Sequence, residues 1–266
     1  MGRSTEVSGA SVPKQGTRQS QKMGSYVYGV VLANTKLPDE QGLGDPAGKV
    51  RLIKHDEIAA VVSPVNVEQP LGRPGDFMAH ARLLDSMIAK GPVLPFRFGG
   101  VLASPEAVVE ELLEPHHDDF LSALDQIKGH AQYVLKGRYV EQALIAEILA
   151  ENPEAGALRE AMRGKDEDAT RNERIRLGEI IAASIEMKRN MDTQVAVEAL
   201  DGTFAQAAVR EPTHEQDAVH LAMLSKMSDH KAIEKAVKKL GERWSGRVQL
   251  RLLGPLAPYD FVTAQG

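Results

Sequence analysis

The sequence contains no cysteine and a single tryptophan among its 266 residues. The lack of cysteine excludes disulfide bonds and thiolate metal sites, and it is compatible with a reducing interior. No apolar run approaches the roughly 18 residues that a helix needs to cross a bilayer. The formal net charge of −5 offers no basic footprint for the phosphate backbone of a nucleic acid. The sequence therefore argues against disulfide-bonded, membrane-spanning and nucleic-acid-binding proteins.

The remaining composition is typical of a folded globular chain, with 42% apolar and 26% charged residues and enough length for two ordinary domains. Residues 1–24 differ, because they carry four basic residues and one acid and are dominated by Ser, Gly, Gln and Thr. They also lack the continuous apolar segment of a secretory signal. We therefore expect residues 1–24 to form a disordered basic tail, and order to begin near Tyr26.

Apolar patterns in residues 25–128 predict an N-terminal α+β domain. The run YVYGVVLA from Tyr26 is typical of a buried strand, and Ser104 followed by Pro105 predicts the start of a helix. A helix capped by Asp76 and ending at Gly91 would place Phe77 on its inward face, with His80 at the edge of that face. The other expected strands are 50–53 and 58–63, joined by a tip at His55, Asp56 and Glu57, and 93–98.

Residues 129–253 predict a C-terminal domain with a different order of elements. Strand, helices, strand, strand, helix and strand follow one another, which is the βαββαβ order of ferredoxin-like folds. The first helix is expanded into a helical hairpin over residues 137–200, because a helix from about 168 to 200 would be roughly 45 Å long and needs a partner. We assign residues 254–266 to a C-terminal tail. The predicted fold class is thus α+β with two domains.

Three segments resemble functional motifs but fail on spacing. GLGDPAGKV, residues 42–50, has Leu43 where a phosphate loop needs its first glycine, and a strand is expected to follow it. Four consecutive side chains, His116 to Asp119, cannot converge on one ion from a helix. His214 and His220 are six residues apart, whereas the zinc-protease motif needs four. We therefore expect no catalytic residue, no metal site and no cofactor.

One segment stands out against this background. GPVLPFRFG, from Gly91 to Gly99, is matched near the C-terminus by GPLAPYDFV, from Gly254 to Val262, with Asp260 in the place of Arg97. Two prolines in a short extended run predict an edge strand or an extended tail, because proline lacks a backbone donor. Strand alternation would put Phe96 and Phe98 on one side and Arg97 on the other.

We expect the two matching segments to lie near the domain junction, each at the end of a sheet. The junction residues would be Tyr259, Asp260 and Phe261. A direct contact between Arg97 and Asp260 is one hypothesis for how the segments meet.

These segments, together with YVYGVV at Tyr26, GRYVEQALIAEILAENPEA at Gly137, RIRLGEIIA at Arg174 and REPTHEQDAVHLA at Arg210, resemble the GvpF/GvpL family of gas-vesicle proteins, close to its actinobacterial members. The resemblance covers nearly everything after Tyr26. It implies two α+β domains, the second ferredoxin-like with a helical hairpin. It also implies a cytoplasmic, vesicle-associated, non-enzymatic accessory protein that binds the apolar shell protein and other gas-vesicle accessory proteins during nucleation or assembly.

Within that implied function, we expect the first domain to provide the docking surface. The expected partner-binding residues are Phe96, Arg97 and Phe98, with His80 nearby; in the alternative interpretation both rings belong to the core. Two other functions stay open: a structural component retained in the vesicle wall, and an enzyme or small-ligand-binding protein on a ferredoxin-like scaffold. The latter would need a convergent polar pocket with shifted titrating groups.

Overall fold

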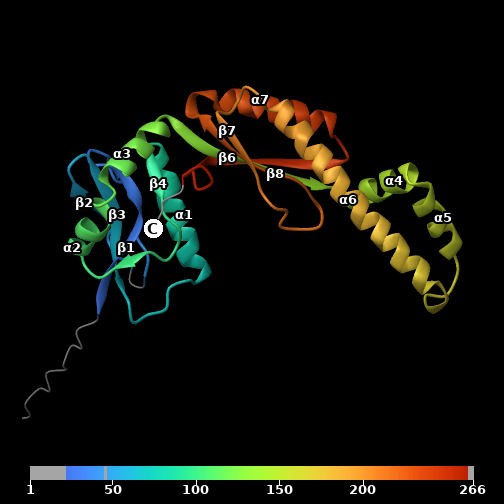
Figure 1. Ribbon diagram of the computed structural model, residues 1–266, viewed down its shortest axis with the longest axis horizontal. Helices are drawn as coiled ribbons and strands as arrows, with labels where there is room; N and C mark the ends of the chain where they lie inside the picture. Colours follow the sequence, from blue (N-terminus) through green and yellow to red (C-terminus); the bar gives the residue numbers. More distant parts are fainter. Residues whose placement is uncertain (1–21, 45–46, 263–266) are drawn as a thin grey trace, which may run out of the picture.

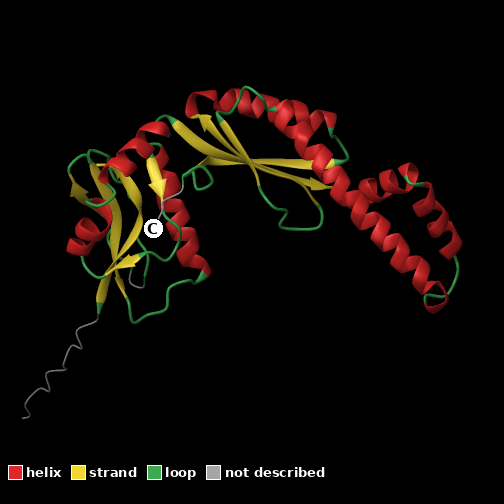
Figure 2. Ribbon diagram, in the orientation of Figure 1, coloured by secondary structure: helices red, strands yellow, loops and turns green. Residues whose placement is uncertain are grey.

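The computed structural model describes residues 22–44 and 47–262. Figure 1 shows an elongated arch with one sheet at one end, the other sheet near the middle, and a long helix that projects at the far end with shorter helices beside it. Figure 2 shows that helices cover both sheets, as expected for a mixed α and β chain. Among the described helices, none is both long and apolar enough to cross a membrane.

The first sheet is built from the N-terminal half. Its main path has the order β2-β3-β1-β4, and β5 also pairs with β1. The strands are β1 Met23–Leu32, β2 Arg51–His55, β3 Ile58–Asn66, β4 Val93–Pro95 and β5 Val101–Leu102. His55 pairs with Ile58, so a two-residue turn joins β2 and β3 and the predicted hairpin is confirmed. Strand β1 begins at Met23, inside the segment expected to be a tail; residues 1–21 of that segment lie outside the described part of the chain.

Both faces of the first sheet are buried. Helix α1, Pro74–Ile88, covers one face, where Tyr26, Tyr28 and Val31 of β1 point. Helices α2 Pro105–Ala107, η1 Val108–Leu113 and α3 His117–Gln126 cover the other, where Val27 and Val30 point. Burial on both sides explains why β1 is a nearly continuous apolar run instead of an alternating one.

Strands β4 and β5 lie end to end along one edge of β1. Pro95 pairs with Gly29, and Val101 pairs with Tyr26. Between them the chain still contacts β1, because the Phe96 amide donates to the Tyr28 carbonyl at 2.9 Å and the Val27 amide donates to the Gly100 carbonyl at 2.9 Å. The edge position predicted from the prolines is confirmed. The ladder itself stops at Pro95, three residues short of the expected strand.

The second sheet has the order β7-β8-β6-β9, and all its neighbouring strands are antiparallel. Its strands are β6 His130–Tyr139, β7 Gln206–Val209, β8 Asp217–Lys226 and β9 Val248–Leu256. The helices of this half are α4 Glu141–Glu151, α5 Pro153–Met162, η2 Asp168–Thr170, α6 Arg171–Ala199, η3 Met227–Asp229 and α7 His230–Arg243. Helix α6 extends beyond the sheet and packs against α4 and α5, which forms the predicted hairpin (Figure 1).

Three expected positions differ in the structure. Helix α1 begins at Pro74, so Asp76 is not its N-cap; its carboxylate lies inside the first turn and accepts the Gly72 and Arg73 amides. Phe77 faces outward with half of its surface exposed. The buried stripe is His80, Leu83, Leu84, Met87 and Ile88, shifted from the expected one because α1 packs against the C-terminal half as well as the first sheet. Strand β9 also continues to Leu256, beyond the expected tail boundary.

Candidate functional site

His80 links three elements of the N-terminal half. Its Nε2–H donates to the Phe96 carbonyl at 3.1 Å, and its Nδ1 accepts the Tyr26 hydroxyl at 2.8 Å. The Tyr26 oxygen in turn accepts the Gly99 amide at 3.1 Å. The chain of bonds fixes helix α1 to β1 and holds both ends of the Phe96–Gly99 segment. His80 is 4% exposed, so it positions this segment from the interior instead of contacting a partner.

Aromatic rings surround this histidine. We call the group Tyr26, Tyr28, His80, Phe98 and Tyr259 the ring cluster. The Phe98 ring centroid lies 5.7 Å from those of Tyr26 and His80, and the Phe77 ring covers it at 4.1 Å. Such edge-on and offset contacts add to the gain from burial. Phe98 is therefore held in one position below the half-exposed Phe77.

The environment of His80 makes stability depend on pH. Burial lowers the pKa of His80, and the hydrogen bond to the Phe96 carbonyl only partly opposes that shift. Below about pH 6.5 the unfolded chain takes up a proton that the folded chain does not. We expect the free energy of unfolding to fall there by up to about 1.4 kcal/mol per pH unit until the lower folded pKa is reached. Urea unfolding at about pH 7.5 and about pH 5.5 measures this loss.

The control for that measurement is a second histidine. Burial also lowers the pKa of His220, which is less deeply enclosed. We expect His80→Gln to reduce the acid-dependent loss of stability more than His220→Gln does. An unchanged acid-dependent loss in His80→Gln would contradict this role for His80.

Phe96 and Phe98 do not share one side of the sheet. Phe96 packs with the α3 face, where its ring centroid is 6.0 Å from that of Phe120, whereas Phe98 belongs to the α1 face. The expectation from strand alternation is wrong here because the regular ladder ends at Pro95 and the chain turns at Gly99, whose φ is +109°. Arg97, between them in the chain, is exposed.

Two exposed side chains next to this segment were not identified from the sequence. Phe77 is 50% exposed and Met78 is 61% exposed, and both lie in the first turns of α1. We call Phe77, Met78 and the underlying Phe98 the α1 patch. The sequence did contain a signal for this exposure. Phe77 and Met78 are adjacent at the start of the helix, and the apolar stripe of this helix needs only one of them.

The C-terminal segment lies between the two halves. The Ala257 amide donates to Asp85 of α1 at 2.8 Å, and the Tyr259 ring lies 6.4 Å from His80. The Asp260 amide donates to Gln132 of β6 at 3.0 Å. These contacts join α1 to the second sheet, and burial raises the pKa of Asp85.

The hypothesis of a contact between Arg97 and Asp260 is wrong. The Asp260 carboxylate forms a two-bond pair with Arg210, which follows β7, and Arg210 Nε lies 3.0 Å from Asp260 Oδ1. The segment GPLAPYDFV ends at the second sheet, so Asp260 pairs with Arg210 of that half instead of with Arg97. The residue at the matching position in the first half, Arg97, is exposed.

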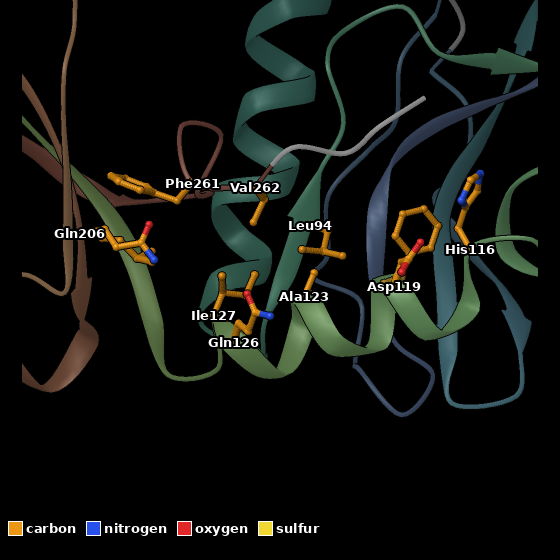
Figure 3. A pocket seen from close by; sticks show the side chains of 11 residues that line it. Leu94, His116, Asp119, Ala123, Gln126, Ile127, Gln206, Phe261 and Val262 are labelled. Carbon is orange, nitrogen blue, oxygen red and sulfur yellow. The ribbon is translucent and has the colours of Figure 1, made fainter.

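A groove of about 500 Å³ runs beneath this C-terminal segment. Figure 3 shows that α3 forms one side, with Ala123, Gln126 and Ile127, while Phe261 and Val262 lie across from it. Leu94 of β4 and Gln206 of β7 also line the groove, so both sheets contribute. Phe261 therefore lines a groove to which both sheets contribute.

The segments that resemble known motifs have structural roles. The Leu43 amide donates to the Tyr28 hydroxyl at 2.7 Å and Leu43 is buried, so the glycine-rich loop is anchored to the core. Asp217 accepts the amides of Thr213 and His214, which forms a local turn. In the part of the chain that the structure describes, one group of side chains has donor atoms close enough together to hold a metal ion. The group consists of Asp56, Glu57 and His117.

Comparison with known proteins gives consistent results. Residues 24–263 match the family model described as gas vesicle synthesis protein GvpL/GvpF. The chain is 32% identical over 245 residues to gas vesicle protein F of a Streptomyces species, covering 90% of this chain and all of that protein. It is 23% identical over 244 residues to gas vesicle protein F of Microcystis aeruginosa, covering 90% and 98% of the two chains.

Solved structures show the same fold. The crystal structure of GvpF from Anabaena superposes with a TM-score of 0.73 at 21% identity, covering 90% of this chain and 97% of the other. That of GvpF from Microcystis aeruginosa superposes with a TM-score of 0.70 at 22% identity, covering 90% and 98%. The sequence match over nearly the whole described chain, together with this shared arrangement of two sheets, shows that the chain belongs to the GvpL/GvpF family of gas-vesicle proteins.

Proposed function

We propose that this chain is an accessory protein of gas-vesicle formation that binds the apolar shell protein through the α1 patch. Family membership supports a gas-vesicle role. The observation that carries the binding surface is the exposure of two adjacent large apolar side chains, Phe77, whose ring packs on the fixed Phe98 ring, and Met78. Neighbouring large apolar side chains exposed together are typical of interaction sites.

The patch suits temporary cover of an apolar subunit. Phe98 is fixed by the ring cluster, so little conformational entropy is lost when a partner packs over it. Met78 has a flexible, polarizable side chain that adapts to irregular apolar surfaces. Arg97 precedes Phe98 in the chain and is exposed, and a charge at the rim of an interface influences the rate and register of association more than the affinity. The partner is therefore expected to present an apolar helix or groove surface.

The sheet edge itself is a less suitable docking point. Pro95 in β4 and Pro92 directly before it lack backbone donors, which disfavours regular addition of another strand. The C-terminal segment also lies close to β4, since Val262 and Leu94 line the same groove (Figure 3). We therefore assign shell binding to side chains of the α1 patch, with Phe96 and His80 supporting the segment from below.

We further infer that residues 25–128 and 129–253 act as two domains, the second ferredoxin-like. The strand order β7-β8-β6-β9 supports this inference, because it is the second, third, first and fourth strand in chain order. The order β2-β3-β1-β4 of the first sheet follows the same rule. In this proposal the protein performs no catalysis and acts in association with gas vesicles and their other accessory proteins.

Two matched methionines test the binding surface. Met78 is 61% exposed on α1, and Met191 is 62% exposed on α6. We expect Met78→Glu to weaken binding of the purified shell protein at least about tenfold, because a buried methionine contributes about 1.5–3 kcal/mol. Met191→Glu should leave the affinity unchanged. Weaker binding in Met191→Glu with normal binding in Met78→Glu would place the surface on the helical hairpin instead.

A transient role and a retained role differ in stoichiometry. Washed, intact vesicles can be assayed for this protein relative to the shell protein by quantitative mass spectrometry. A temporary cover should be nearly absent, whereas retention in fixed proportion would support a structural wall component.

A further inference from the structure

The tip of the β2–β3 hairpin meets the first turn of α3. His117 Nε2 lies 3.1 Å from Glu57 Oε2, although the two residues are 60 positions apart. Asp56 is at the same tip, and the donor atoms of Asp56, Glu57 and His117 all lie within 4.8 Å of one another. The four consecutive residues 116–119 cannot converge on one ion by themselves. Here the donor atoms come from two elements of the fold.

The spacing of these three donors is close to what one metal ion requires. Imidazole nitrogen and carboxylate oxygen bind Zn²⁺ at about 2.0–2.2 Å, so donors around a tetrahedral ion are about 3.3 Å apart. The His117–Glu57 distance is already in that range. A mixed imidazole and carboxylate set without sulfur suits divalent first-row ions.

A fourth residue orients the histidine. His117 Nδ1 lies 3.0 Å from Asp118 Oδ1, on the opposite side of the ring from Glu57. Histidines that ligate a metal usually donate their other ring N–H to a carboxylate in this way, which fixes the tautomer and strengthens the ligand. His55 stands beside the set, with its ring centroid 5.8 Å from that of His117 and its Nε2 3.8 Å from Asp56 Oδ2.

We propose that Asp56, Glu57 and His117 form a surface site for a divalent first-row transition-metal ion, with Asp118 holding the His117 ring and His55 within reach as a further ligand. The exposed carboxylates, 71% for Asp56 and 65% for Glu57, leave the remaining coordination positions open to water. A bound ion would join the hairpin tip to α3 across the face of the first sheet opposite α1. This inference is independent of shell-protein binding.

Titration of the untagged full-length chain with Zn²⁺ tests the site by calorimetry. We expect one saturable site per chain, weakened at least about tenfold in His117→Asn and in Glu57→Gln, since loss of one ligand or its partner typically costs 10–100-fold. His214→Asn is the matched control because His214 is exposed on a distant loop, and it should bind as the unmodified chain does.

A second readout separates specific binding from loss of folding. Zn²⁺ should raise the melting temperature of the unmodified chain and of His214→Asn, and a chelator should reverse the rise. Glu57→Gln keeps the shape of the side chain, so its metal-free melting temperature should be retained while the rise is lost. The proposal would be overturned if Zn²⁺ gave no saturable heat, or if His117→Asn and Glu57→Gln bound Zn²⁺ as tightly as the unmodified chain does. Either result would mean that the cluster is an ion pair only.

Discussion

Arg247→Ala is expected to lower the free energy of unfolding by about 3 kcal/mol, because it leaves the buried Asp192 carboxylate without a counter-charge. Arg247 donates from Nη1 and Nη2 to Asp192, both at 2.9 Å, and from Nε to Glu147 at 2.7 Å. Its guanidinium also lies 5.6 Å from the centre of the Tyr139 ring. The Asp192 side chain is only 9% exposed, so water cannot replace the lost bonds.

The loss would extend beyond one pair. Tyr139 at the end of β6 donates to Asp192 at 2.6 Å, and Lys188 donates to Glu147 and Glu151, both at 2.6 Å. Burial raises the pKa of Tyr139, and the bond to Asp192 raises it further, so the hydroxyl remains a donor. These contacts join α4 and α6 to the second sheet at the base of the hairpin. We expect the hairpin to become more sensitive to proteolysis in Arg247→Ala.

A matched arginine provides the control. Arg176 also bonds one carboxylate through two nitrogens, Nε at 2.8 Å and Nη2 at 3.4 Å from Glu154, but both partners are more than half exposed. Exposed pairs contribute about 0–1 kcal/mol, so Arg176→Ala should change stability little. Urea unfolding of both variants measures the difference. Equal losses of stability in Arg247→Ala and Arg176→Ala would show that burial does not explain the contribution of the pair between Arg247 and Asp192.

Gly29→Ala is expected to lower the free energy of unfolding by about 3 kcal/mol, at the upper end of the cost of overpacking. A Cβ at Gly29 would stand 2.3 Å from the Leu94 carbonyl oxygen and 3.3 Å from Leu84 Cδ2. The nearer neighbour is backbone of β4, which cannot move away without breaking its pairing with β1. The sequence YVYGVV needs its glycine for this close approach.

Gly29→Ala should also alter the α1 patch. Phe96 is held by the carbonyl of Tyr28, next to Gly29, so displacement of β4 would shift the segment that carries Phe98. We therefore expect Gly29→Ala to reduce shell-protein binding as well as the melting temperature. Gly178→Ala is the control, because no atom lies within 4 Å of a Cβ on that residue of α6. It should stabilise the chain by about 0.5–1 kcal/mol. A normal melting temperature in Gly29→Ala would contradict the close packing of β1 against β4.

Local patterns predicted most helices and strands of the second half. The α7 stripe of Ile233, Val237 and Leu240 is strongly periodic, and β8 and β9 are bounded by turn residues. The Ser104 cap is also confirmed, since its side chain accepts the Ala107 amide at 3.2 Å. These features depend on neighbours in the chain, so they are visible without knowledge of the fold.

Orientations of single side chains were harder to predict. Phe77 lies outward because α1 rotates to place His80 against Tyr26, a contact between residues 54 positions apart. Arg210 takes the partner expected for Arg97, because the segment after β9 is held at the second sheet, where the Asp260 amide donates to Gln132 of β6, instead of at the edge of the first sheet. The position of Phe77 and the partner of Asp260 cannot be predicted from residue spacing, since each depends on how two elements pack.

The amino-acid sequence alone determined the order of helices and strands, the edge position of the proline-rich segment and, through its motifs, the resemblance to gas-vesicle proteins. Backbone preferences and apolar periodicity act over a few residues, so they can be read along the chain. The tertiary structure alone decided which rings are exposed, which charges pair, and that His117 meets the hairpin tip. Those contacts join residues 50 or more positions apart, and only the packed fold brings them within bonding distance.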